Sequence, residues 1–229
     1  MAMPAAQTMQ MITAASPRSG GALPATPPGA RTVAAFELIE ARDDESRREL
    51  EAFIRHRYAL AYGATVRHFL PRLFALRDRR GQLIAAFGLR GAASERLVLE
   101  TYLAEPVEAQ LSTATGVSAH RDAIMEVGNL AGRHPGALRI LISTLAQALP
   151  SFGARWVVFT GGPQLINGFE RLGVPLLTLA PARLERLPVD ERADWGRYYD
   201  YAPTVMCANV RITQRRLAQV AHADAVENA

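Results

Sequence analysis

The chain has 229 residues, of which 49% are hydrophobic and 21% are charged, with 17 glycines, 14 prolines and one cysteine. This composition excludes disordered and fibrous proteins, and the length is that of about one medium domain. Cys207 cannot form a disulfide within the chain, and without a Cys/His cluster the sequence excludes zinc-finger and iron–sulfur motifs, so no metal site is predicted.

The net charge is +4, and all 26 basic residues are arginines. Between Arg42 and Glu49 the arginines alternate with acids instead of forming a basic block. This pattern favours a solvated surface over a face that binds nucleic acid. No run of about 18 apolar residues occurs, so the sequence predicts no membrane-spanning helix.

The composition divides the chain into three parts. Residues 1–32 are rich in Ala, Pro, Ser, Thr and Gly and lack periodicity, which predicts a disordered N-terminal arm. Polar residues and prolines interrupt every apolar run in this arm, so no secretory signal is predicted and a cytoplasmic location is expected. Residues 33–212 form the predicted domain, and residues 213–229 form a polar C-terminal tail.

The first half of the domain predicts a strand, a helix and a hairpin. A β-branched run covers residues 32–39, and Asp43 or Asp44 then opens a helix. Strands at 73–77 and 83–89 flank a charged turn, which is typical of a hairpin. The next segment is ambiguous, since residues 96–102 fit a strand and residues 106–111 fit the start of a short helix.

The second half predicts a parallel strand pair within a mixed sheet. The pattern gives a strand at 123–130, a helix at 135–149 and a buried strand at 155–160. A crossover of this kind places the two strands parallel. Three further predicted elements complete the sheet and its cover: a helix at 163–172, which Gly173 ends, and strands at 176–179 and 205–212. The fold class is α/β of the α+β type, with a largely antiparallel sheet.

Residues 125–136, "MEVGNLAGRHPG", form a candidate anion-binding loop. A strand leads through Gly132, Arg133 and His134 into the helix predicted to begin at Pro135, with Gly136 in its first turn. Free N–H groups at a helix start bind phosphate, and glycine lets the backbone approach closely. The alternative is a purely structural strand–loop–helix connection, because neither GxGxxG nor a P-loop is present.

Glu126 is a carboxylate inside an otherwise apolar strand. Either a partner keeps it charged in a structural role, or burial raises its pKa into the range of a general base. Asn129, further along the strand, either binds substrate or closes the strand end. The cluster "WGRYY" at residues 195–199 either lines a pocket or packs as a surface lid.

Taken in order, these motifs resemble the core of the GNAT superfamily of acyltransferases. More closely, "EVGNLA", "WVVFT", "FERLGV" and "WGRYYDYAPTVMCANV" resemble the thermostable hemolysin family, over roughly residues 35–212. The resemblance implies a GNAT-like fold in which the parallel strands that carry Glu126 and Trp156 splay apart to admit the thioester arm. It also implies no tightly bound cofactor.

The resemblance further implies a co-substrate and a set of site residues. The co-substrate is acyl-coenzyme A (acyl-CoA) or the acyl-phosphopantetheine of an acyl carrier protein. Glu126 would be the general base, with Asn129 beside it, and the backbone of Leu130 or Ala131 would hold the thioester carbonyl. The residues implied to face the donor are Leu130, Ala131, Gly132, Arg133, His134, Gly136 and Ala137. The residues implied to bind substrate are Trp156, Thr160, Tyr198 and Tyr199.

The implied function is an N-acyltransferase that acylates a small amine or amino acid. Phe169 stands where the superfamily often has a tyrosine that protonates the leaving thiolate, so Tyr198 or Tyr199 could supply that acid. Two alternatives stay open. One is a membrane-active, hemolysin-like protein, and the other is an inert binding module with the acyltransferase fold.

Overall fold

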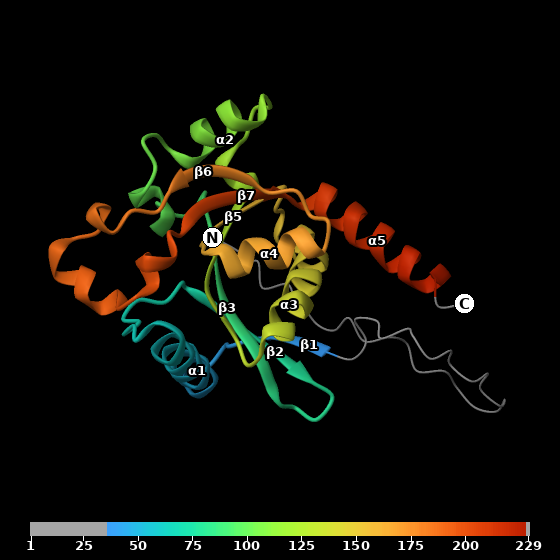
Figure 1. Ribbon diagram of the computed structural model, residues 1–229, viewed down its shortest axis with the longest axis horizontal. Coiled ribbons are helices and arrows are strands. Elements are labelled where there is room, and N and C mark those ends of the chain that lie inside the picture. Colours follow the sequence, from blue (N-terminus) through green and yellow to red (C-terminus); the bar gives the residue numbers. More distant parts are fainter. Residues whose placement is uncertain (1–35, 228–229) are drawn as a thin grey trace, which may run out of the picture.

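The computed structural model describes residues 36–227 and shows one seven-stranded sheet with helices on both faces (Figure 1). The predicted arm at residues 1–32 lies outside the described residues. The strands are β1 (Phe36–Glu40), β2 (Arg72–Asp78), β3 (Leu83–Gly91), β4 (Ile124–Gly132), β5 (Trp156–Gly161), β6 (Leu177–Pro181) and β7 (Thr204–Asn209). The α-helices are α1 (Asp44–Tyr62), α2 (Val107–Thr115), α3 (Pro135–Ala148), α4 (Pro163–Arg171) and α5 (Val210–Glu227). Short 3-10 helices include η2 (Val98–Thr101), η6 (Val189–Trp195) and η7 (Tyr198–Tyr201).

The strand order is β1-β2-β3-β4-β5-β7-β6, and β4–β5 is the parallel pair. The other five neighbouring pairs are antiparallel. The predicted mixed, largely antiparallel sheet with a parallel central pair is therefore confirmed. The parallel pair arises because the α3 crossover returns the chain to the same end of the sheet, whereas the short turn at residues 79–82 makes β2 and β3 antiparallel.

Helix α1 begins and ends at residues suited to those positions. The Asp43 side chain accepts a hydrogen bond from the Ser46 N–H (2.8 Å), and Asp44 and Glu45 occupy the first turn. Acidic side chains there offset the free N–H groups and the positive end of the helix dipole. Gly63 ends the helix with φ of 67°. The predicted helix start is confirmed.

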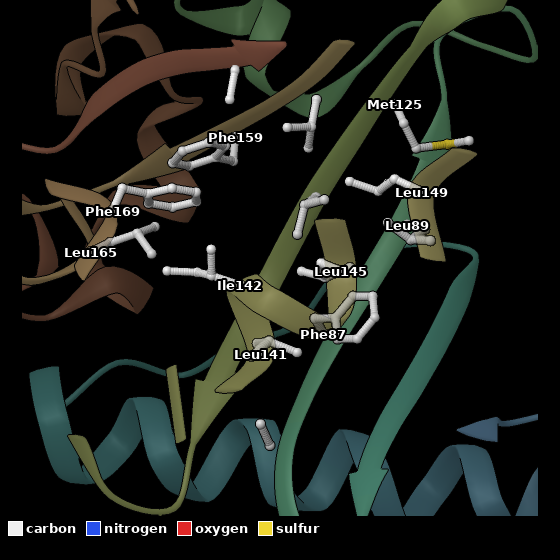
Figure 2. Packing of buried hydrophobic residues seen from close by; sticks show 14 of the residues in the cluster. Phe87, Leu89, Met125, Leu141, Ile142, Leu145, Leu149, Phe159, Leu165 and Phe169 are labelled. Atoms are coloured by element: carbon white, nitrogen blue, oxygen red, sulfur yellow. The ribbon is translucent and has the colours of Figure 1, made fainter. Parts of the chain in front are cut away.

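The two faces of the sheet carry different layers. On one face, hereafter the α3 face, helices α3 and α4 pack on the central strands through residues such as Ile142, Leu165 and Phe169 (Figure 2). On the other, the α1 face, α1 covers β2 and β3, while η2 and α2 cover β4, β5 and β7. Alternation along each strand sends successive side chains to opposite layers.

Two predicted strand assignments are corrected by the structure. Residues 96–102 form no strand; they contain η2, and the helix expected near residue 106 is α2. The strand expected at 205–212 ends at Asn209, whose Oδ1 accepts a hydrogen bond from the Ile212 N–H (3.1 Å). This is an N-cap, so the chain turns into α5, and the segment predicted as a polar tail is helical to Glu227.

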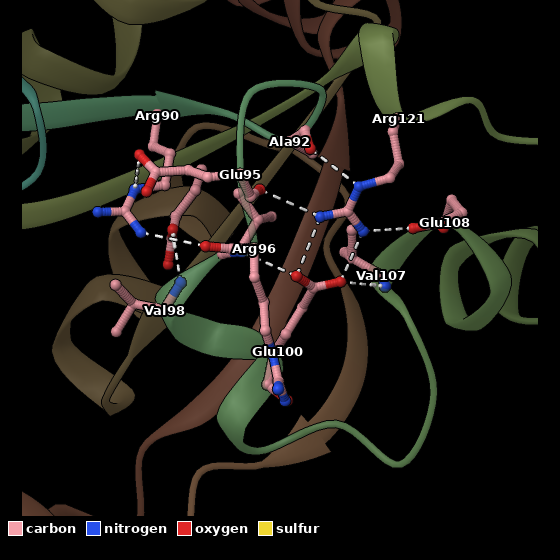
Figure 3. A network of polar contacts seen from close by, with 11 residues as sticks. Arg90, Ala92, Glu95, Arg96, Val98, Glu100, Val107, Glu108 and Arg121 are labelled. Carbon is pink, nitrogen blue, oxygen red and sulfur yellow. Dashed lines mark hydrogen bonds and ion pairs between the residues drawn. The ribbon is translucent and has the colours of Figure 1, made fainter.

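A buried ion pair fixes η2 and α2 against the sheet (Figure 3). Glu100 is only 5% exposed and accepts hydrogen bonds from the Leu97 and Val107 N–H groups, both at 2.8 Å. Arg121 donates to Glu100 at 2.7 Å and to Glu108 at 2.6 Å. The carboxylate thus joins the start of η2, the start of α2 and the residues before β4.

Candidate functional site

The parallel strands β4 and β5 pair over only part of their length. Their register runs from Ile124 opposite Trp156 to Val127 opposite Phe159. Beyond these residues β4 pairs only with β3, and β5 pairs only with β7. The facing edges of Gly128–Gly132 and Thr160–Gly161 therefore part. The expected separation of the strands that carry Glu126 and Trp156 is therefore present, and it begins beyond both residues, which lie in the paired stretch.

A β-bulge in β4 lies at the point of separation. Ala131 pairs with Ala86 and Gly128 pairs with Gly88, so Asn129 and Leu130 together oppose the single residue Phe87. Asn129 has φ of 51°, a left-handed conformation that asparagine tolerates better than most residues. The extra residue bends the strand and breaks its alternation.

Asn129 also fastens a loop across the α1 face. Its Oδ1 accepts a hydrogen bond from the Leu70 N–H (2.9 Å), and its Nδ2 donates to the His68 carbonyl (3.2 Å). The Leu70 side chain lies over Gly88 and Gly128, where a Cβ would come within 2.7 Å and 2.9 Å of it. At Gly88 the approach is to the Leu70 Cβ, which cannot swing away, so glycine is required there; at Gly128 it is to the end of the Leu70 side chain, which can shift. Of the two interpretations of Asn129, substrate binding and closure of the strand end, these contacts fit the second.

Glu126 lies on the α1 face, is 4% exposed, and comes two residues before Gly128, where the separation begins. Its two oxygens accept hydrogen bonds from the Leu99 and Val98 N–H groups, both at 3.0 Å. Burial raises the pKa of Glu126, the two N–H groups and the nearby Arg90 oppose the rise, and Glu100 adds to it. The partners that hold this carboxylate are thus backbone amides of η2, and its pKa is shifted in the direction that suits a base.

The loop between β4 and α3 contains only Arg133 and His134. Arg133 is tied to β3, since its N–H donates to the Ile84 carbonyl (2.8 Å) and its Nε to the Leu83 carbonyl (3.0 Å). His134 is the N-cap residue of α3 and its side chain is exposed. A Cβ on Gly136 would lie 3.3 Å from the His134 ring, so glycine keeps the first turn open beside the imidazole.

A narrow apolar cavity of about 30 Å³ lies on the α3 face, next to the separation. Val127 and Leu130 of β4, Leu138 and Ile142 of α3, and Leu165 and Phe169 of α4 contribute to its wall. Figure 2 shows Ile142, Leu165 and Phe169 directed toward one another. Phe169 stacks on Phe159 with ring centroids 5.1 Å apart. Because phenylalanine has no hydroxyl, this position offers no proton donor.

The four residues expected to bind substrate lie in different surroundings. Thr160 is half-buried just past the separation, on the same face as Glu126. Trp156 is buried at the paired end of β5. Tyr198 and Tyr199 belong to an aromatic cluster over the α1 face. The structure thus brings Glu126, Asn129, Leu130 and Thr160 together at the separation and leaves Trp156 apart.

One residue that sequence reasoning missed lies close to this site. Tyr102 follows η2 directly, is 8% exposed, and its hydroxyl lies 2.5 Å from the Tyr199 hydroxyl. The two residues are 97 positions apart. No spacing in the sequence relates them, because the contact depends on how the η7 segment folds back over η2.

Solved structures with a similar fold include an N-acyl amino acid synthase and a CoA-dependent acyl-homoserine lactone synthase. FeeM, an N-acyl amino acid synthase from uncultured soil microbes, is 12% identical with a TM-score of 0.54, covering 81% of this chain and 96% of that chain. TofI in a ternary complex with an inhibitor and MTA is 14% identical with a TM-score of 0.52, covering 80% and 96%. BjaI, a CoA-dependent acyl-homoserine lactone synthase solved with SAM and isopentyl-CoA, is 12% identical with a TM-score of 0.51, covering 82% and 89%. At these identities the similarity establishes the fold, which is GNAT-like as predicted.

No curated protein sequence matches the chain. In residues 36–227 no helix combines the length and the apolar character needed to cross a membrane. Residues 40–214 match the sequence model of a family described as thermostable hemolysin. This match spans most of the chain and confirms the resemblance found in its motifs. The protein belongs to the thermostable hemolysin family.

Proposed function

We propose that this protein is an N-acyltransferase that moves an acyl group from a thioester to a small amine or amino acid. One observation carries the proposal: the parallel strands separate two residues after a buried carboxylate with a raised pKa. The opening has this carboxylate on one face of the sheet and an apolar cavity on the other. A thioester that lies between the strands would then meet a base and an acyl-binding wall from opposite sides.

The first turn of α3 and the adjoining loop are proposed to hold the donor. Gly132 and Gly136 have no side chain to keep a pyrophosphate or a phosphopantetheine phosphate from the backbone, and His134 lies beside them at the surface. Ala137 is buried and its N–H donates to the His134 carbonyl (3.0 Å), so it is left out of the proposed donor site. The apolar residues between β4, α3 and α4 would take the start of the acyl chain. The isopentyl-CoA solved with BjaI supports a CoA thioester as donor, and an acyl carrier protein presents the same phosphopantetheine arm. The reaction is proposed to take place in the cytoplasm, where such donors are made.

In the proposed reaction Glu126 accepts the proton of the attacking amine. The amine nitrogen forms a bond to the thioester carbonyl carbon, and the carbon–sulfur bond then breaks to release the thiol. Negative charge that develops on the carbonyl oxygen would be stabilised by the N–H of Leu130 or Ala131, at or just after the bulge. The bulge favours this role because it turns the backbone of β4 out of regular pairing with β3.

The test is product formation by the full chain. Purified protein is incubated with acetyl-CoA, longer acyl-CoA and acyl carrier protein thioesters and a pool of amines and amino acids, and N-acyl products are measured by mass spectrometry. We expect Glu126→Gln to lower the rate by about 10² to 10⁴ while circular dichroism stays unchanged. Products that are independent of Glu126 would contradict its role as base.

Two other outcomes would support the alternative functions. Saturable CoA binding without any acylated product would favour an inert binding module, for which Phe169 in the apolar wall is the specific observation. Leakage of liposomes that is unaffected by Glu126→Gln would favour a membrane-active protein.

The same assay identifies the donor, if product forms from only one of the two donor classes, acyl-CoA or acyl carrier protein thioesters.

A further inference from the structure

One hydroxyl belongs to the otherwise apolar wall of the cavity on the α3 face. Thr213, in the first turn of α5, is 5% exposed and contributes to this wall. The other side chains of the wall are all Ala, Val, Leu, Ile or Phe. Within the described part of the chain, Thr213 is thus the one residue of the wall with a polar side-chain atom, and this buried Oγ1 has no hydrogen-bond partner.

A buried threonine in a helix ordinarily bonds to a carbonyl of its own helix. Thr144 of α3 does so: it is 8% exposed, and its Oγ1 donates to the Ile140 carbonyl (2.9 Å). Thr213 forms no such bond. A buried hydroxyl without a partner destabilises a fold, so valine would suit this wall better. The packing of the fold therefore does not account for a threonine here.

A water molecule is a poor partner for the Thr213 hydroxyl. Buried water needs about two to four polar neighbours, and an apolar cavity stays dry. The side chains of this wall offer one such neighbour, Thr213 itself. A ligand that enters the cavity and brings its own polar atom would satisfy the hydroxyl.

Thr213 lies at the end of the cavity away from the strand separation. Helix α5 begins where β7 ends (Figure 1), and there Ala208 of β7 pairs with Val157. The last paired residue before the separation is Phe159, two residues further along β5. Two residues of a strand span about 7 Å, and a carbon chain advances about 1.3 Å per carbon. An acyl chain whose carbonyl lies at the separation would reach the level of Thr213 at about its sixth carbon or beyond.

We propose that the donor carries an acyl group with a hydroxyl or keto oxygen near its far end, and that Thr213 binds this oxygen. The inference rests on the proposed acyltransferase function and names its donor class, an oxygenated medium-chain acyl group. The threonine hydroxyl can donate to either kind of oxygen and can accept from a hydroxyl. The apolar side chains of the narrow cavity must move apart to admit the methylenes, and the hydrogen bond fixes how far the chain enters.

The test measures the binding of CoA thioesters to the full chain by isothermal titration calorimetry, without an acceptor amine. The ligands are octanoyl-CoA, 8-hydroxyoctanoyl-CoA, 7-oxooctanoyl-CoA and 3-hydroxyoctanoyl-CoA. We expect a terminal oxygen to tighten binding about tenfold over octanoyl-CoA, as one buried hydrogen bond does. A gain for both terminal oxygens shows that Thr213 donates, and a gain for the 8-hydroxyl alone shows that it accepts. The 3-hydroxyl stays near the separation and should give no gain that depends on Thr213.

Thr213→Val removes the hydroxyl and keeps the shape of the side chain. It should abolish the preference for a terminal oxygen and keep the affinity for octanoyl-CoA within about twofold. The Tm of the free protein should stay unchanged or rise, because an unpaired hydroxyl is removed. Thr144→Val is the matched control, since its hydroxyl is already paired and lies outside the wall, and it should leave the preference intact.

Three results would overturn the inference. One is equal binding of the four thioesters by the wild type, or a preference that persists in Thr213→Val. Another is a preference for the 3-hydroxyl that depends on Thr213, because the oxygen site would then lie near the separation. The third is a clear fall in the Tm of Thr213→Val, which would show that the hydroxyl serves the fold.

The proposed function is tested separately, by adding amines and measuring N-acyl products from the same thioesters. A preference that depends on Thr213 without any product would overturn acyl transfer and leave Thr213 as the residue that binds the oxygen. Products that form with no preference for a terminal oxygen would support acyl transfer and overturn the role of Thr213.

Discussion

The behaviour of Glu126 toward pH follows from its surroundings. Burial raises its pKa above the ordinary value of 4.5, and the N–H groups of η2 and the Arg90 guanidinium offset only part of the rise. A base must be ionised, so the activity should fall on acidification while the pH is still above 4.5. The pH profile of kcat/KM for acyl transfer measures this limb. A limb at or below 4.5 would contradict the raised pKa.

Ionisation of Glu126, which the proposed catalysis requires, lowers the stability of the fold. Because the folded-state pKa is raised, the protonated form stabilises the fold at low pH, and this contribution is lost as the pH rises through the folded-state pKa. Urea unfolding of wild type and Glu126→Gln at matched pH values should therefore differ more at neutral pH than at pH 4. Activity and stability at this residue thus change in opposite directions with pH.

The sequence pattern identified Glu126 as a buried carboxylate but not what holds it. An acid in an apolar strand is recognisable from local context, because burial of a charge requires compensation. Its partners are N–H groups of Val98 and Leu99, and backbone amides leave no mark in side-chain identity. Tyr102 was missed for a related reason, since its partner is distant in the chain.

At the scale of elements, one buried carboxylate organises η2 and α2. Burial disfavours the charged form of Glu100, but hydrogen bonds from Arg121, Val107 and Leu97 outweigh it and lower its pKa to about 2. The stability that ionised Glu100 contributes is present at pH values above its ordinary pKa of 4.5 and is lost as the pH falls from there toward 2. These non-local bonds also explain why residues 94–112 were ambiguous in the sequence.

Arg121→Gln should destabilise the fold because it leaves Glu100 buried without its cationic partner. We expect a loss of about 3 kcal/mol in the free energy of unfolding at pH 7, measured in urea. Arg67→Gln is the control, because Arg67 is 63% exposed where it pairs with Asp194 and should cost at most about 1 kcal/mol. Similar losses in the two variants would contradict the role given to Glu100. Since η2 also holds Glu126, Arg121→Gln should reduce activity too.

The strand and helix pattern was predictable wherever local periodicity decides it. The hairpin, the β4–α3–β5 unit and α4 match their predicted positions, because their apolar residues repeat with the period of one element. The end of β7 was not predicted, since an Asn side chain rather than a change in hydrophobicity starts α5 there. The bulge at Asn129 was likewise missed, because its register depends on β3.

Across the whole molecule, the sheet divides the proposed site into two independent halves. The proposed acyl-binding wall lies on the α3 face, whereas Glu126 lies on the α1 face. Substitutions more than about 7–10 Å apart without shared partners combine additively in free energy. Changes on the α3 face should therefore alter the choice of acyl chain and leave the dependence on acceptor and leaving group intact.

Ala146→Leu tests this division. Ala146 is 3% exposed on α3 and contributes to the wall of the apolar cavity, so the larger side chain occupies space that an acyl chain would take. Loss of room for two methylenes, at about 0.8 kcal/mol each, should lower kcat/KM for longer acyl donors about tenfold or more relative to acetyl donors. Ala218→Leu, on the exposed side of α5, should leave this preference unchanged. Combined with Glu126→Gln, the effect of Ala146→Leu should multiply; a chain-length preference that changes with Glu126 would show that the sheet does not separate the two halves.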